Sequence, residues 1–148
     1  MWNFRRVVFV IGLVMLAGCE PQLTDSPIPL TTFADMVINL SLPEYAALRV
    51  DGGFKMFNNI GVRGVIVYRV SNSSFHAYER NCSYHPNEAG ATVDIHSSNL
   101  FMQDFSCNST FNFSDGQPQG GPAWRPLRQY HTDVTGNNFL TITSDAIN

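Results

Sequence analysis

The sequence predicts an all-β domain, built as a small antiparallel sandwich or barrel. No stretch shows the sustained 3.6-residue periodicity of an amphipathic helix. Many short runs of apolar or alternating residues are instead separated by clusters of Gly, Pro, Asn and Ser. Only 14% of the residues are charged while 12% are aromatic, which suits a small core with long polar loops. Short strands divided by turn signals are typical of sandwiches and barrels.

The first predicted strand covers residues 33–42, where apolar residues alternate with polar ones. A proline at position 43 ends it and allows one helical turn over residues 43–48, because proline is tolerated at the first helical position. Asp-Gly-Gly at 51–53 then predicts a turn, and residues 54–57 a short strand.

The most regular pattern is a hairpin in the middle of the chain. Residues 65–70 are apolar and β-branched almost throughout, which predicts a strand covered on both faces. Residues 71–74 form its turn, and residues 75–80 return with alternating character.

The second half of the chain predicts shorter strands. Residues 117–122 contain two prolines and a Gly-Gly pair and are therefore predicted to be a loop. The last hairpin turns around Gly-Asn-Asn at 136–138. The strands predicted here cover residues 91–95, 99–105, 110–113, 127–134 and 139–143.

The N-terminus has the three zones of a secretory signal peptide. Arg5 and Arg6 precede an apolar run over residues 7–16, which is too short to span a membrane. Leu-Ala-Gly-Cys at 16–19 resembles the bacterial lipobox, in which the cysteine becomes the acylated first residue of the mature protein. The resemblance implies a lipoprotein lipidated at Cys19 and attached to the membrane through that lipid. An ordinary secretory signal with a chance cysteine is the alternative.

The chain accordingly divides into three parts. Residues 1–18 are the predicted signal peptide, residues 19–32 carry the acylated cysteine and a proline-rich flexible tether, and residues 33–145 form one domain. Removal of the signal leaves seven basic and twelve acidic residues, a net charge of −5. That charge argues against a nucleic-acid partner.

Two cysteines remain in the predicted domain, Cys82 and Cys107, each in a short polar loop after an apolar run. Two such loops, if they meet in the fold, could hold a metal ion or close a disulfide. Motifs of hydrolases and phosphate-binding enzymes are absent from the sequence, including Gly-x-Ser-x-Gly, His-Glu-x-x-His and the phosphate loop. We therefore expect no enzymatic activity.

The order of these segments is similar to that of Rieske-type iron–sulfur domains. After the second cysteine loop come Phe-Asn-Phe-Ser-Asp-Gly at 111–116 and Gly-Pro-Ala-Trp-Arg-Pro-Leu at 121–127. The resemblance covers roughly residues 33–145 and is strongest to the lipid-anchored Rieske-like proteins of Bacteroidetes. It implies a Rieske-like β-sandwich or barrel whose two loops carry the cluster site or its remnant.

A Rieske centre binds a [2Fe–2S] cluster through two cysteines and two histidines. The resemblance places these four ligand positions at Cys82, Tyr84, Asp104 and Cys107. A tyrosine and an aspartate thus stand at two of the positions, and Cys107 stands where a histidine belongs. The match implies a degenerate site in a retained fold.

We consider four chemical states for Cys82 and Cys107. The favoured one is a disulfide between Cys82 and Cys107, which an oxidising compartment would permit. The second is a cluster with altered ligands that include His85 and Asp104. The third is a single metal ion such as zinc on Cys82, His85 and Cys107, with His96 as a further ligand. The fourth is a pair of free thiols.

The preferred functional hypothesis is a cluster-free, non-enzymatic lipoprotein that serves as a structural or binding module of the cell envelope, with an envelope protein as a possible partner. The Bacteroidetes resemblance implies the outer membrane. The alternative is a [2Fe–2S] electron-transfer protein of the Rieske type. His76 and His131 fall on predicted strands and are expected to be ordinary strand residues rather than ligands.

Overall fold

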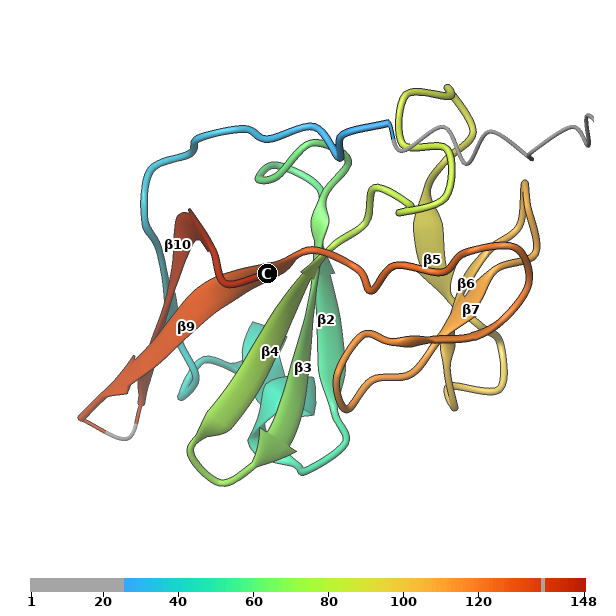
Figure 1. Cartoon of the computed structure of the whole chain (residues 1–148). Coiled ribbons are helices and arrows are strands. Elements are labelled where there is room, and N and C mark those ends of the chain that lie inside the picture. The colour runs from blue at the N-terminus through green and yellow to red at the C-terminus, as the bar shows by residue number, and fades with distance from the viewer. Residues whose placement is uncertain (1–25, 137) are drawn as a thin grey trace, which may run out of the picture.

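The computed structural model describes residues 26–136 and 138–148, so the signal peptide and Cys19 lie outside the described residues. The described chain forms two antiparallel sheets (Figure 1). The larger sheet has the strand order β1-β10-β9-β4-β3-β2. Its strands are β1 (Met36–Asn39), β2 (Phe54–Phe57), β3 (Val65–Ser71), β4 (Ser74–Glu79), β9 (Gln129–Thr135) and β10 (Phe139–Ala146).

The smaller sheet has the order β5-β6-β7-β8. Its strands are β5 (Val93–Ile95), β6 (Met102–Asp104), β7 (Thr110–Phe111) and β8 (Pro118–Gly120). A 3-10 helix, η1 (Pro43–Arg49), begins at the proline that was expected to start a helical turn. The predicted all-β class is confirmed. Among the described residues, no helix has the length and apolar character needed to cross a membrane.

Strand β3 separates two hydrophobic cores. Val65, Ile66 and Val67 are all fully buried, as predicted for a strand covered on both faces. Val65 and Val67 face the first core with Ile38, while Ile66 faces the second core with Met102. Each buried side chain contributes roughly 1.5–3 kcal/mol through removal from water. The second core joins the larger sheet to the smaller one and lies beneath the two cysteine loops.

The prediction that residues 117–122 form a loop is wrong in part, because Pro118–Gly120 forms the strand β8, which pairs with β7. This strand is at the edge of its sheet, and Pro118 is its first residue. Proline can occupy such a position because no neighbouring strand requires its missing N–H. The predicted strand over residues 99–105 is shorter than expected, since only Met102–Asp104 pairs with its neighbours.

The N-terminal described segment crosses one end of the domain before it reaches β1 (Figure 1). Arg125 donates from Nη2 to the Ser26 carbonyl at 2.9 Å, and Arg128 donates to the Ile28 carbonyl at 3.5 Å. Phe33 packs edge-on against Tyr130 with ring centroids 5.1 Å apart. The last residues of the predicted tether therefore lie on the domain surface.

Candidate functional site

The first cysteine loop begins where β4 ends. Asn81 forms a β-bridge with Thr92, and the Cys82 N–H donates to the Ala91 carbonyl at 3.0 Å. These bonds close residues 82–91 into a loop with a narrow neck. Cys82 is fully buried at the base of the loop, in contact with the second core.

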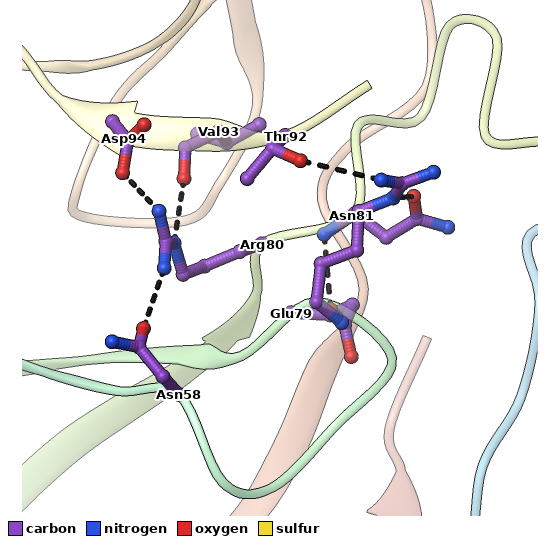
Figure 2. Close-up of polar contacts among 8 residues, drawn as sticks. Asn58, Glu79, Arg80, Asn81, Thr92, Val93 and Asp94 are labelled. Atoms are coloured by element: carbon purple, nitrogen blue, oxygen red, sulfur yellow. Dashed lines mark hydrogen bonds and ion pairs between the residues drawn. The ribbon is translucent and has the colours of Figure 1, made fainter. Parts of the chain in front are cut away.

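A buried carboxylate holds the start of this loop. Glu79 is fully buried, and its two oxygens accept four hydrogen bonds. Oε2 accepts from the Val62 N–H at 2.7 Å and the Tyr130 hydroxyl at 2.8 Å, and Oε1 accepts from the Arg63 and Asn81 N–H groups, each at 3.0 Å. The bond to the Asn81 N–H is drawn in Figure 2. A buried charge needs such donors, because burial without them is very costly. Burial, then the bond to Glu79, raises the pKa of Tyr130.

The guanidinium of Arg63 ties the far side of the loop to the larger sheet. Its Nε donates to Asn81 Oδ1 at 2.7 Å, and its Nη1 donates to the Ala89 carbonyl at 2.7 Å. Its Nη2 donates to the Glu88 carbonyl. One side chain thus fixes both ends of the first cysteine loop.

Arg80 makes the corresponding link to the smaller sheet (Figure 2). Its Nε donates to the Val93 carbonyl at 2.9 Å, its Nη1 donates to Asn58 Oδ1 at 2.7 Å, and its Nη2 pairs with Asp94. The strands β4 and β5 are therefore held in a fixed relation on either side of the loop.

The second cysteine loop is a tight turn built on Asp104, the last residue of β6. Asp104 Oδ1 accepts from the Ser106 N–H at 2.8 Å and the Ser106 hydroxyl at 2.6 Å. Asn108 has a φ of 59°, a left-handed conformation that asparagine tolerates. The Asp104 N–H then donates to the Ser109 carbonyl at 2.9 Å, which closes the turn.

Residues 121–127 contact both cysteine loops. The Ala123 N–H donates to the buried Ser109 hydroxyl at 3.1 Å. The Ser83 hydroxyl donates to the Arg125 carbonyl at 2.7 Å, and the Arg125 guanidinium returns a bond to the Ser83 carbonyl at 2.8 Å. Gly121 has a φ of 81°, and a Cβ there would lie 2.5 Å from the Ser109 Cα. This segment therefore braces both loops.

The two loops meet at their cysteines. The Sγ atoms of Cys82 and Cys107 are 3.9 Å apart, and Cys107 Sγ lies 3.4 Å from Asp104 Oδ2. The ligand atoms of these three residues all lie within 4.8 Å of one another. They form a group of potential metal ligands in the described part of the chain.

The surroundings shift the acidity of this group. Burial is the main cause that raises the pKa of the Cys82 thiol, and the neighbouring Asp104 carboxylate raises it further. Burial also acts to raise the pKa of Asp104, but hydrogen bonds from Ser106, Cys82 and Cys107 outweigh it and lower that pKa overall. The arrangement is an ionised carboxylate beside two thiols.

The structure does not bring the other predicted site residues into this group. The Tyr84 ring stacks on His85 with centroids 3.9 Å apart, and His85 is exposed and pairs with Glu88 at 3.0 Å. His96 stacks on Phe101 with centroids 4.3 Å apart. The grouped ligand atoms include neither histidine. A metal site that uses His85 or His96 is thus not supported, because their own loops hold these rings elsewhere.

The remaining histidines lie on strands, as predicted. His76 is half-buried and bonds through Nδ1 to the Tyr78 hydroxyl at 2.7 Å, and that hydroxyl donates to the Phe113 carbonyl at 3.0 Å. Burial is the main cause that lowers the pKa of His76. His131 is exposed on β9.

The grouped residues differ from the two cysteines and two histidines that hold a Rieske-type [2Fe–2S] cluster. Such a cluster needs two pairs of ligands, one pair for each iron. The ligand atoms of Cys82, Asp104 and Cys107 instead lie within 4.8 Å of one another, and this described group contains no histidine. Carboxylate is also a harder ligand than this cluster prefers.

The predicted disulfide stays a prediction. The structure brings Cys82 and Cys107 together but holds both as free thiols. Their 3.9 Å separation is nearly twice the S–S bond length of about 2.05 Å.

No family model matches the sequence, and no curated protein matches it either. Among solved structures, the chain is similar to one described as a complex of reduced oxygenase and oxidized ferredoxin in carbazole 1,9a-dioxygenase. The two chains are 21% identical with a TM-score of 0.45, over 65% of this chain and 84% of the other. At this identity and TM-score the likeness assigns neither a family nor a function.

Proposed function

We propose that this chain is a Rieske-like lipoprotein, anchored to the membrane through Cys19, that acts without a [2Fe–2S] cluster as a non-enzymatic module of the cell envelope. Its role is structural or consists of binding an envelope protein. The observation that carries this proposal is the ligand set at the meeting of the two loops. Three ligand atoms within 4.8 Å of one another suit one centre and not a two-iron cluster.

The construction around the site supports a retained scaffold. Glu79, Arg63 and the segment 121–127 fix both loops through buried and partly buried hydrogen bonds. Buried polar networks of this kind keep a loop conformation without help from a cofactor. The loops can therefore serve as a rigid surface for another protein.

Two exposed aromatic side chains beside the site favour a binding role. Phe105, next to Asp104, is 59% exposed, and Trp124, next to Ala123, is 52% exposed. The Arg125 guanidinium lies 5.1 Å from the Trp124 ring centroid. Aromatic residues and arginine are enriched in protein interfaces, so these residues are the first to test for contact with a partner.

The lipid anchor rests on the lipobox at residues 16–19, which is outside the described residues. Several acyl chains would give effectively stable membrane attachment. The outer membrane of the envelope is the proposed location.

The test is to purify the full chain from membranes and to measure visible absorption, iron and acid-labile sulfide. We expect a colourless protein without either element, and lipid attached at Cys19. A brown protein that contains iron and acid-labile sulfide in equal amounts would overturn the proposal in favour of an electron carrier. Crosslinking in intact cells with photoreactive groups at positions 105 and 124 would then identify the partner.

A further inference from the structure

The geometry of Cys82, Asp104 and Cys107 matches one face of a tetrahedral zinc site. Two thiolates bound at about 2.3 Å with tetrahedral angles are about 3.8 Å apart, and a thiolate and a carboxylate oxygen are about 3.5 Å apart. The corresponding distances are 3.9 Å between the two Sγ atoms and 3.4 Å from Cys107 Sγ to Asp104 Oδ2. Two of the three separations are therefore already close to those that a metal ion would impose, and the third, between Cys82 and Asp104, is within 4.8 Å.

A second layer of hydrogen bonds orients these ligands. Ser106 donates twice to Asp104 Oδ1, which leaves Oδ2 directed toward Cys107. Ser109 accepts a bond from the Ala123 N–H, and its hydroxyl lies 3.1 Å from Cys107 Sγ, where it can donate to a thiolate. Outer partners of this kind fix metal ligands in position and are a usual part of metal sites.

The site also has the burial that such a metal needs. Cys82 and Asp104 are buried, whereas Cys107 is half-buried. The group is thus closed toward the second core and open on the side of Cys107. Cys107 is therefore the member of the group that solvent reaches, and the proposed metal would meet solvent on its side.

We propose that Cys82 Sγ, Cys107 Sγ and Asp104 Oδ2 bind a single soft divalent cation, Zn²⁺, with water as the fourth ligand. Each thiol loses its proton to solvent when the metal binds, so two protons are released for each ion. Two thiolates and one carboxylate against one dication leave the site with a net charge of −1. The ligand set is sulfur-rich, which favours zinc over Mg²⁺ or Ca²⁺.

The first experiment uses the full chain in detergent under a reducing, oxygen-free atmosphere, after treatment with a chelator. Zn²⁺ is titrated in two buffers of different ionisation enthalpy, and Co²⁺ is titrated in parallel. We expect one ion per chain, release of about two protons, and the strong visible absorption of tetrahedral cobalt with a thiolate charge-transfer band. A chain that binds no metal with both thiols reduced would overturn the inference.

Variants then test two of the three ligands and one outer partner. Cys107→Ser should reduce the thiolate charge-transfer band of bound cobalt, and Asp104→Asn should change its d–d spectrum. Each substitution should also weaken zinc binding by more than tenfold. Ser106→Ala should weaken zinc binding by about tenfold, since it removes only an outer partner. The matched control is Asp133→Asn, which alters an exposed carboxylate on β9 and should bind zinc as the parent does. Unfolding of each metal-free variant is measured to show that the domain is folded.

Equal zinc affinity in the parent, Cys107→Ser and Asp104→Asn proteins would place the metal elsewhere and overturn the inference. Isolation of a quantitative Cys82–Cys107 disulfide that resists reduction in the folded protein would overturn it as well. The zinc-binding measurements test this inference independently of the proposed function. Iron and sulfide in the purified protein would contradict the cluster-free role, whereas failure to bind zinc would leave that role standing.

Discussion

The hydroxyl of Tyr130 donates to Oε2 of the buried Glu79 at 2.8 Å, across a sequence separation of 51 residues. This bond joins β9 to the end of β4, immediately before the first cysteine loop. Both side chains are fully buried. The geometry of the candidate site thus depends on a polar contact that lies in the first core and not in the loops themselves.

Replacement of Glu79 by glutamine should destabilise the domain by roughly 2–4 kcal/mol. Each of the two carboxylate oxygens accepts two hydrogen bonds. The amide nitrogen of glutamine would therefore face N–H or O–H donors whichever way the side-chain amide is turned. Tyr130→Phe is the matched comparison, because it removes only one donor and should cost about 1–2 kcal/mol. Urea unfolding measures both values. A Glu79→Gln variant as stable as Tyr130→Phe would show that the backbone donors contribute little.

Gly121→Ala should destabilise the domain by about 2–3 kcal/mol and should disturb the second cysteine loop. The new Cβ would lie 2.5 Å from the Ser109 Cα and 2.6 Å from the Asn108 carbonyl oxygen. Gly136→Ala is the control, because Gly136 also has a positive φ, of 60°, but apart from its chain neighbours no atom of the described residues lies within 4 Å of the added Cβ. That control should lose only the conformational cost of about 1 kcal/mol. Thermal unfolding compares the two, and equal losses would argue against the close approach.

The central hairpin could be predicted from the sequence because its pattern is local. Residues 65–67 are consecutive, apolar and β-branched, and a strand with both faces buried is the structure that such a run favours. The strand β8 could not be predicted in the same way. The prolines and glycines of residues 117–122 indicate a loop, and only the position at the sheet edge makes Pro118 acceptable as a strand residue.

The site was predictable in part. Cys82 and Cys107 stood out by residue type, and Asp104 entered through its position in the resemblance. The supporting residues Arg63 and Glu79 carried no local signal, because their partners are chosen by strand register and loop closure. His85 and His96, the two histidines offered as alternative ligands, lie outside the group for a different reason. Their residue type suggests metal binding, but short-range contacts hold them away from the sulfur atoms.

Arg63→Ala should loosen the first cysteine loop more than it destabilises the whole domain. The side chain donates to Asn81 at the neck of the loop and, in two exposed bonds, to the Glu88 and Ala89 carbonyls near its other end. We expect faster amide hydrogen exchange over residues 82–91 and faster alkylation of Cys82, with a global loss of about 1–3 kcal/mol. Arg49→Ala, at the exposed end of η1, is the control. Unchanged exchange in the loop of the Arg63→Ala variant would contradict the assigned role.

His76 should make the domain less stable as the pH falls below about 6.5, the ordinary value for histidine. Burial lowers the pKa of His76 in the folded state, so between its folded pKa and about 6.5 the unfolded chain binds more protons than the folded one. Stability that is present above about pH 6.5 is therefore lost as the pH falls through the folded pKa. Urea unfolding at a series of pH values should show this loss in the parent protein, and it should be smaller in His76→Gln. The control His131→Gln, at an exposed position on β9, should keep the parent dependence of stability on pH. If His76→Gln also keeps the parent dependence, another group causes the loss of stability.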